Sequence, residues 1–410
     1  MNSYAVVVTG MGVVAPHGDS PTTLFEALML GHSAIHPVFP ELPKPAAAAT
    51  VAFDASRWFT KLQLAGVDRV SQLAVAAAEL AMKDAGAAGT VEAERIGVFV
   101  GCGMGGAAAL EAAYRSGNTQ SGGSGRVPPL TIPAFMPNAP AAHVAMRQGV
   151  HGPVLTYSVA CASSSLAIAE AAKAVQRGDV DLAIAGGSEA LIVPGVVMVM
   201  AWQAMQTLAS FAPGEAADAV RPFAADRSGF ALGEGAAFIV LESAERAKAR
   251  GAKHYATLAG WGSSCDATHL TKPDAPGQAR ALRQALKMAD LEPRDIGYCN
   301  AHGTATRIGD EVEAKALAEV WGTDIQALKV SSTKALHGHL LGAAGAIEAV
   351  ITVMALYEQR LPPNAHCVTP DPACALNLVL EPGYSAANAQ AAISNSFAFG
   401  GTNSVLLFKR

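Results

Sequence analysis

Cys161 lies where residues 157–165 change abruptly from a β-branched and aromatic run to small residues. The stretch 166–177 then carries apolar residues at helical spacing, so we expect a helix to follow. The unpaired N–H groups and the positive dipole end at the start of a helix would lower the pKa of this thiol, which predicts a nucleophile. A buried structural cysteine is the alternative, because most free cysteines are of that kind.

Two histidine-bearing segments further along the chain complement this thiol. His302 follows a strand-like run and begins a loop in 300–306, and His339 follows Lys334 in the segment 334–345. Loops at strand ends often carry catalytic groups, and histidine exchanges protons near neutral pH. A thiol with two histidines predicts covalent acyl chemistry. A cysteine protease would contain the same set, and either histidine alone could be a structural turn residue.

A third element is the turn in 394–403, which contains the adjacent glycines Gly400 and Gly401. Adjacent glycines let backbone N–H groups approach a ligand closely, as an oxyanion hole requires. The alternative is an ordinary tight turn beside a core strand.

The elements that must position these residues form a pattern that occurs twice. Strands alternating with helices predict an α/β fold with helices on the faces of a mixed or parallel sheet. Two such halves would stack in layers with the site at their junction, and the halves would meet near Arg250, giving 1–250 and 251–410. The turn at Cys161 corresponds to 328–334. The other repeated segments are 71–85, 95–101 and 182–187 in the first half, and 277–289, 295–303 and 393–401 in the second.

Composition limits the class of protein. Of 410 residues, 51% are apolar and 15% are charged, and 40 are glycine. The length exceeds a single core, and the composition is typical of a buried α/β enzyme with two domains or two fused halves. A net charge of −5 with no basic run argues against a nucleic-acid partner.

The cysteines and the apolar segments indicate a cytoplasmic protein. The six cysteines show no CxxC spacing, which favours reduced thiols. Residues 1–9 show no signal-peptide pattern. The longest apolar stretch, 191–205, is broken by Pro194, Gly195 and Gln203 and is shorter than the ~20 residues of a membrane helix. We expect this stretch to line a pocket or a subunit interface, and we expect no membrane association.

The combined motifs resemble the β-ketoacyl-[acyl-carrier-protein] synthases, the elongating condensing enzymes of the thiolase superfamily. The resemblance also includes 8–16, 221–223 and 229–235 and covers nearly the whole chain. It implies a duplicated thiolase-like fold, with two mixed five-stranded sheets and helices in αβαβα layers. The implied reaction is a decarboxylative Claisen condensation of a cysteine-bound acyl group with malonyl-[acyl-carrier-protein].

The resemblance also implies a role for each site residue. Cys161 would accept the acyl group, His302 and His339 would flank the malonyl thioester, and Lys334 would order the histidine side. The backbone N–H groups of Cys161 and Phe399 would form the oxyanion hole. Further implied residues are Met104, Thr304, Thr306, Phe399 and Gly400 for substrate binding and gating, Asp310 and Glu313 in a charged network around Lys334, and Asn300, Glu348, Ser394 and Asn395 around a structural monovalent cation.

The implied partners follow from the same resemblance. Substrates would arrive on the phosphopantetheine of an acyl carrier protein, with no other cofactor. The enzyme would be a homodimer, or a heterodimer with a chain-length-factor-like paralogue. Carrier proteins are acidic, yet 186–220 contains no Lys or Arg, so Arg57, Lys61 and Arg69 are the candidate basic contacts.

The chain departs from the usual pattern of these enzymes in its turn and its nucleophile segment. Ala398 stands where the family turn has glycine, and 160–165 lacks the threonine of the housekeeping version. These departures favour a specialised polyene or polyketide pathway over core fatty-acid synthesis. His337 is expected to be a loop histidine beside the site and not a third catalytic group.

Other functions remain to be weighed against the condensing enzyme. Residues 101–106 match GxGxxG, but Glu111 comes too early for a ribose-binding carboxylate ~20 residues on, so a glycine-rich loop beside the acyl pocket is the better interpretation. A non-catalytic chain-length subunit would lack the nucleophile. A degradative thiolase would carry a second reactive cysteine near the C-terminus. A cysteine hydrolase would need neither Lys334 nor a duplicated framework.

Overall fold

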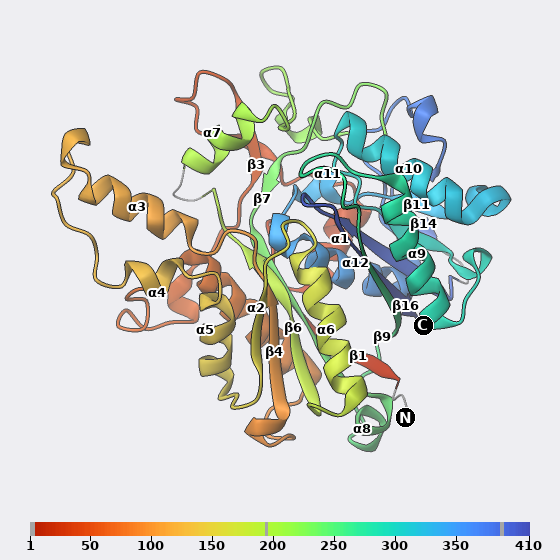
Figure 1. Cartoon of the computed structure of the whole chain (residues 1–410), viewed down its shortest axis with the longest axis horizontal. Helices are drawn as coiled ribbons and strands as arrows, with labels where there is room; N and C mark the ends of the chain where they lie inside the picture. The colour runs from red at the N-terminus through yellow and green to blue at the C-terminus, as the bar shows by residue number, and fades with distance from the viewer. Residues whose placement is uncertain (1–4, 193–195, 386–388) are drawn as a thin grey trace.

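An eleven-stranded mixed sheet runs through the protein in the order β13-β11-β10-β15-β16-β9-β1-β8-β6-β4-β5. The computed structural model describes residues 5–192, 196–385 and 389–410, and Figure 1 shows their arrangement. Small sheets β12-β14 and β2-β3-β7 accompany the large one. The strands are β1 (Val6–Val14), β2 (His36–Val38), β3 (Ala46–Ala49), β4 (Ile96–Gly101), β5 (Val154–Tyr157), β6 (Leu182–Glu189), β7 (Leu232–Gly233), β8 (Gly235–Ser243), β9 (Ala256–Cys265), β10 (Tyr298–Asn300), β11 (Lys329–Ser331), β12 (Arg360–Leu361), β13 (Asn377–Leu378), β14 (Tyr384–Ser385), β15 (Ala391–Phe397) and β16 (Thr402–Lys409).

The two halves of the large sheet repeat one another strand by strand. In the first half β1 and β8 are antiparallel, β8 and β6 are antiparallel, and β6, β4 and β5 are parallel. In the second half β9 and β16 are antiparallel, β16 and β15 are antiparallel, and β15, β10 and β11 are parallel. This repetition of order and direction confirms the predicted duplication.

One detail of the predicted sheets needs correction. Each half supplies five principal strands, as expected, but the halves are not separate sheets. The first residues of β1 pair with β9 as well as with β8, from Val6 opposite Leu258 to Val8 opposite Ala256. This pairing satisfies backbone groups at two edges that would otherwise meet without partners. The short strand β13 extends the outer edge beside β11.

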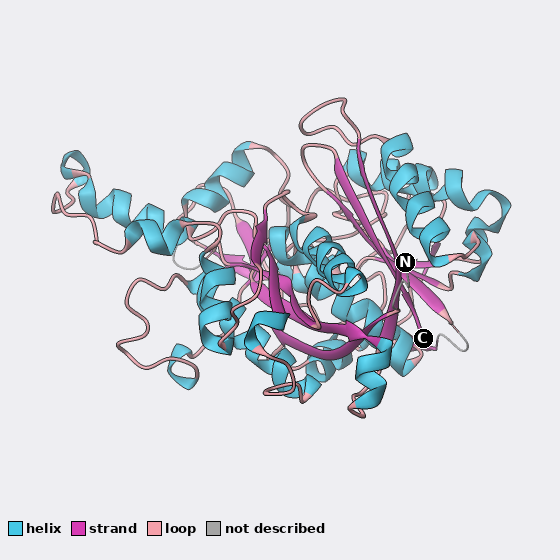
Figure 2. Cartoon of the chain, turned by 60° about the horizontal axis from the view of Figure 1, so that its bottom comes forward, coloured by secondary structure: helices cyan, strands magenta, loops and turns pink. Residues whose placement is uncertain are grey.

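Helices cover the sheet in the predicted layer order, as Figure 2 shows for the strands and the helices around them. α2 and α5 pack on the first half, α9 and α10 pack on the second, and α6 and α12 lie between the halves. The helices are α1 (Pro21–Met29), α2 (Arg69–Ala85), α3 (Ala107–Gly117), α4 (Thr131–Phe135), α5 (Ala139–Gln148), α6 (Ser163–Arg177), α7 (Val197–Ala204), α8 (Ala244–Ala249), α9 (Ala275–Ala289), α10 (Arg307–Trp321), α11 (Lys334–His337) and α12 (Ala344–Glu358).

The central helix α12 is apolar around most of its circumference because sheet, helix or loop covers every side. By length and composition Leu341–Glu358 could cross a membrane, but 89% of it is buried inside the protein. This segment is therefore a core helix. The division of the chain at 250/251 stays a prediction; α8 and Gly251 lie just before β9.

Candidate active site

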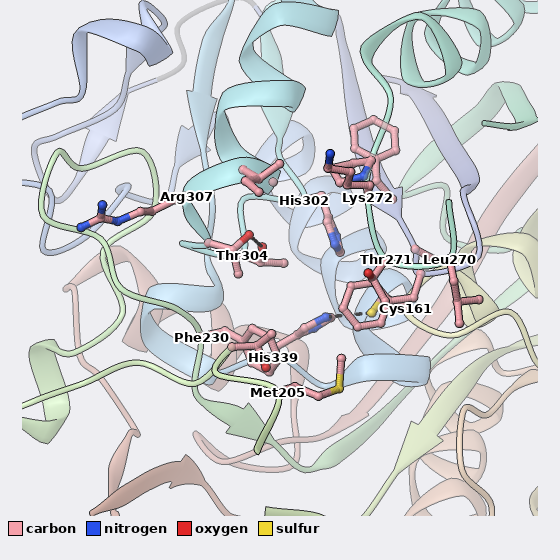
Figure 3. A pocket seen from close by; sticks show the side chains of 18 of the residues that line it. Cys161, Met205, Phe230, Leu270, Thr271, Lys272, His302, Thr304, Arg307 and His339 are labelled. Carbon is pink, nitrogen blue, oxygen red and sulfur yellow. Dashed lines mark hydrogen bonds between the residues drawn. The ribbon is translucent and has the colours of Figure 1, made fainter. Parts of the chain in front are cut away.

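The predicted site residues lie in loops that follow strands of both halves. Cys161 follows β5, His302 follows β10, and Phe399 follows β15. The segment after β11 supplies Lys334 and His339. Loops beyond the carboxyl ends of parallel strands are the usual site positions in α/β sheets, and here the two halves present theirs to one another. Figure 3 shows Cys161, His302 and His339 side by side.

A strained turn positions Cys161. Ala160 has φ 48°, which places a residue with a Cβ in the left-handed region. Ser163 holds this turn: its Oγ donates to the Ala160 carbonyl at 2.6 Å and accepts from the Val159 N–H at 2.9 Å. Helix α6 starts at Ser163, earlier than the stretch predicted from apolar spacing alone. Cys161 therefore lies directly before the first turn of α6.

The predicted activation of the thiol is wrong for the resting state. Burial raises the pKa of Cys161 to about 12, although Lys334 acts in the opposite direction. The sequence indicated the helix start but not the loss of solvent, and Cys161 is only 8% exposed. The thiol therefore carries its proton at neutral pH, and its proton must leave during the reaction.

His339 contacts the thiol directly. Its Nε2 lies 3.0 Å from Cys161 Sγ, and its Nδ1 accepts from the Leu341 N–H at 3.3 Å. Burial, with a further contribution from Lys334, holds the pKa of His339 well below its usual value, so the ring is neutral. Because Nδ1 accepts a hydrogen bond, the single ring proton is assigned to Nε2. His339 therefore points an N–H donor at the sulfur.

His302 completes a three-residue group. One ligand-type atom from each of Cys161, His302 and His339 lies within 4.8 Å of the others, and all three residues are buried. Glu313 fixes the His302 loop, because its carboxylate accepts from the N–H groups of His302 at 2.8 Å and Gly303 at 2.7 Å. Burial and then Lys334 hold the pKa of His302 well below its usual value. Both rings are thus neutral donors beside one thiol.

The charged network around Lys334 differs from the one that the resemblance implies. Lys334 is fully buried and forms an ion pair with Glu348 of α12. Glu313 binds the His302 loop and is also within the electrostatic influence of Lys334, while Asp310 accepts from the Phe223 N–H at 2.8 Å. Lys334 still influences the site electrostatically, because its positive charge disfavours protonation of both neighbouring imidazoles.

His337 is not part of the reactive group. It is fully buried in α11, its Nδ1 lies 2.8 Å from the Gly338 carbonyl, and its Nε2 lies 2.9 Å from Thr333 Oγ1. Burial lowers the pKa of His337 to about 3. Both ring nitrogens have partners, so His337 is a structural neighbour of the site, as expected.

A cavity of about 470 Å³ opens onto the group and includes most of the predicted substrate residues. Thr304 and Thr306 line it with their hydroxyl oxygens 3.0 Å apart, and Phe399 lines it while stacking on Trp202 at 6.1 Å. Met104 does not line this cavity. Its side chain is 41% exposed in the isolated chain, and its role in limiting chain length stays a prediction.

Glu189 explains the glycine-rich sequence of 101–106, and sequence reasoning missed it. Its buried carboxylate accepts from the N–H groups of Gly103 at 2.9 Å, Met104 at 3.2 Å and Gly342 at 3.0 Å. In a dinucleotide site, backbone N–H groups of such a loop would bind a phosphate. Here they bind the Glu189 carboxylate instead. Glu189 also joins the loop after β4 to the turn after His339. The only signal in the sequence was an acidic residue ending a small-residue strand.

The glycine turn after β15 is a tight turn, and its role as an oxyanion hole stays a prediction. Gly400 and Gly401 have φ 88° and 75°, and the Gly400 N–H donates to the Leu270 carbonyl at 2.7 Å. Asn403 donates to Asp266 at 2.6 Å, and the Asp266 N–H donates to Gly401, which anchors the end of the turn. Ala398 lies in the cavity wall outside the left-handed region, so its Cβ is accommodated.

Three of the four residues that the resemblance implies for a monovalent cation offer buried oxygens on one face of the sheet. Asn300 and Ser394 are paired neighbours in β10 and β15, and they share the face of the sheet on which α12 carries Glu348. Asn395, the next residue in β15, faces the other way, where its amide donates to Glu313 at 3.0 Å, so its side chain is not part of this group. Oδ1 of Asn300, Oγ of Ser394 and Oε2 of Glu348 are buried and have no hydrogen-bond partner among the described residues. Neutral oxygens with one carboxylate suit a hard cation of low charge.

The candidate carrier contacts lie away from the cavity at Cys161, whereas part of the apolar stretch 191–205 lines it. Arg57 pairs with Asp19 at 3.0 Å, Arg69 pairs with Glu234 at 3.0 Å, and Lys61 is exposed. Arg57, Lys61 and Arg69 are absent from the lining of the cavity. From the apolar stretch 191–205, Trp202 and Met205 do line it, as predicted, whereas 193–195 fall outside the described residues.

Comparisons with known proteins agree with this geometry. The chain matches the beta-ketoacyl synthase N-terminal domain over residues 3–247 and the beta-ketoacyl synthase C-terminal domain over 255–368. It is 38% identical to 3-oxoacyl-[acyl-carrier-protein] synthase 2 of Staphylococcus aureus (strain COL), covering 99% of this chain and 98% of that protein. It is 41% identical to nodulation protein E of Rhizobium meliloti (strain 1021), covering 99% of both.

A solved structure extends the similarity to three dimensions. It is a type II PKS acyl-carrier protein in complex with its ketosynthase bound to the hexaketide, and the matched chain superimposes with a TM-score of 0.90 at 30% identity, covering 100% of both chains. Family, fold and reactive group therefore agree. The chain belongs to the beta-ketoacyl synthase family and is an acyl-transferring condensing enzyme.

Proposed function

We propose that Cys161, His302 and His339 carry out the decarboxylative condensation of an acyl group with malonyl-[acyl-carrier-protein], giving 3-oxoacyl-[acyl-carrier-protein]. The observation that carries this assignment is the 3.0 Å contact between His339 Nε2 and Cys161 Sγ at the cavity, with His302 in the same group. A protein whose chemistry is acyl transfer needs a nucleophile and donors for an oxyanion in one dry place. These three buried residues supply both.

The first step transfers the acyl group to Cys161. The sulfur attacks the thioester carbonyl, a tetrahedral oxyanion forms, and the bond to the carrier sulfur breaks. The thiol proton passes to the departing carrier thiolate, so no net charge is left. Backbone N–H groups of Cys161 and Phe399 are the proposed oxyanion donors. His339 donates to the sulfur while negative charge is present on it, and Lys334 favours the same charge electrostatically.

The second step uses the two neutral imidazoles. The bond between the malonyl methylene carbon and its carboxylate breaks, carbon dioxide leaves, and the electron pair becomes an enolate on the thioester oxygen. N–H donors from His302 and His339 stabilise that oxygen, each by about 3 kcal/mol or more in a dry site. The enolate carbon then attacks the Cys161 thioester. Collapse of that intermediate releases the 3-oxoacyl product and returns the Cys161 thiolate, which regains a proton.

The partners follow from the substrates. We infer that both acyl groups arrive on the phosphopantetheine of an acyl carrier protein, with no further organic cofactor. The similar type II PKS ketosynthase was solved with its carrier bound, which supports this inference. The proposed assembly is a homodimer or a heterodimer with a chain-length-factor-like paralogue, in the cytoplasm. Ala398 and the similarity to nodulation protein E favour a specialised pathway over core fatty-acid synthesis.

Loading the wild-type enzyme with a series of acyl-carriers tests the function directly. We expect intact-mass spectra to gain the mass of one acyl group per chain, with a maximum at the preferred chain length. Failure of every carrier to acylate the protein would contradict the proposed function.

We further propose that Asn300, Glu348 and Ser394 hold a monovalent cation that stabilises the folded protein. Exchanging potassium and sodium for choline at constant ionic strength should then lower the midpoint of thermal unfolding. Occupancy at about 100 times Kd is worth about 2.7 kcal/mol of unfolding free energy. Ser394→Ala removes one ligand and should reduce this salt dependence. Equal midpoints in all three salts would contradict the cation site.

A further inference from the structure

Two cations line the cavity and were not among the predicted basic contacts. Lys272 comes from the loop between β9 and α9, and Arg307 is the first residue of α10. Both side chains are exposed. In the view of Figure 3 they lie on different sides of Thr304, whose hydroxyl oxygen is 3.0 Å from that of Thr306. The wall of the cavity thus contains positive charge beside hydroxyl groups.

The charged ends of these two side chains make no contacts that stabilise the described part of the fold. Neither Lys272 nor Arg307 forms a side-chain hydrogen bond or an ion pair with any residue in the described ranges. The Arg307 backbone and the loop that contains Lys272 are nevertheless held in place. Arg227 donates to the Arg307 carbonyl at 2.8 Å, and the Asp274 N–H near Lys272 donates to Asp266 at 3.1 Å. Free charged ends on anchored segments are available to a ligand without disturbing the protein.

We propose that Lys272 and Arg307 bind the phosphodiester of the arm that carries the thioester substrates into the cavity. This inference rests on the proposed function. Because Lys272 and Arg307 line the cavity, a ligand that contacts them must reach its opening. A phosphopantetheine arm carries one charged group, its phosphate. Arginine matches phosphate with a fork of N–H donors, and lysine supplies a point charge. Thr304 and Thr306 offer hydroxyl groups to the same polar arm.

The test compares two small thioesters that carry the same acyl group, one on pantetheine and one on 4′-phosphopantetheine. The measured quantity is the second-order rate constant for acylation of Cys161, followed by intact mass. Because a charge-assisted hydrogen bond is worth roughly a factor of ten, we expect wild type to favour the phosphorylated thioester by about tenfold or more. Lys272→Ala/Arg307→Ala should lose this preference while its rate with the pantetheine thioester stays unchanged.

Controls separate the possible outcomes. Lys61→Ala removes an exposed cation that is absent from the cavity lining and should leave the preference intact. Lys272→Arg and Arg307→Lys keep the positive charge, so each variant should retain most of the preference for the phosphorylated thioester. A double variant that keeps the full preference for the phosphorylated thioester overturns the inference. A double variant whose acylation rate falls only with the intact carrier protein also overturns it, because the two cations would then contact the acidic carrier surface. Wild type that is acylated by acyl-carriers but shows no preference between the two small thioesters also overturns the inference, whereas failure of every acyl-carrier to acylate the protein would contradict the condensing function itself.

Discussion

Cys161→Ala should separate the two half-reactions. Without the sulfur no acyl group can be loaded, so we expect condensation to fall by about 10⁴-fold or more and the acyl mass shift to disappear. Release of carbon dioxide from malonyl-carrier should continue, because His302 and His339 keep their neutral N–H donors. Intact mass and carbon dioxide release, measured on the same preparation, report the two steps.

The control for this variant is Cys265→Ala. Cys265 is an exposed free cysteine, so its removal should change neither loading nor decarboxylation. An acyl adduct on the Cys161→Ala protein would contradict the nucleophile assignment. Loss of decarboxylation together with loading would instead show that the sulfur is needed for the second step.

His302→Ala and His339→Ala should have the next largest effect, on the decarboxylation step. Removing one preorganised oxyanion donor costs about 10²–10³-fold in rate. His302 is expected to matter little for loading, because the contact with the sulfur is made by His339. Single-turnover loading of His302→Ala should thus remain near wild type while carbon dioxide release falls. His337→Ala is not a suitable control for this experiment, because both ring nitrogens of His337 hold the fold.

The pH dependence of the wild type is a second readout for these donors. The folded pKa values of His302 and His339 are depressed, so protons bind more readily to the unfolded chain. Their contribution therefore lowers stability as the pH falls through the ordinary histidine value of ~6.5. Decarboxylation per folded molecule should show no histidine limb near that pH. A limb at pH ~6.5 without loss of folded protein would mean that a histidine titrates normally.

Features of the site that depend on neighbouring residues in the chain could be predicted from the sequence, and features that depend on distant segments could not. Cys161, His302 and the Phe399 turn each follow a strand-like run, and local patterns place such residues in loops at a sheet edge. His339 follows the short helix α11 instead. The pKa of Cys161 could not be predicted, because it depends on burial by segments far away in the chain. The ion-pair partner of Lys334 was not predicted for the same reason, since Glu348 approaches from a different helix.

The fold was predictable to a similar degree. Repeated strand and helix segments predicted the duplication and the layers, because each segment shows its own periodicity. The pairing of β1 with β9 was not predictable, since a strand read alone does not show which edge it will meet. Lys272 and Arg307 were missed because each is a single charge in its own segment, and only the fold brings them to one cavity.

The pairing of β1 with β9 has a consequence for how such a chain can change over time. The seam between the duplicated halves contains a ladder of main-chain hydrogen bonds, which depend little on side-chain identity. Substitutions can thus accumulate in either half without shifting one against the other. This allows a division of labour between corresponding loops, in which one half carries the sulfur and the other carries the imidazoles. Each half alone would lack part of the reactive group. Because the seam holds the two halves in a fixed alignment, their loops together form one active site.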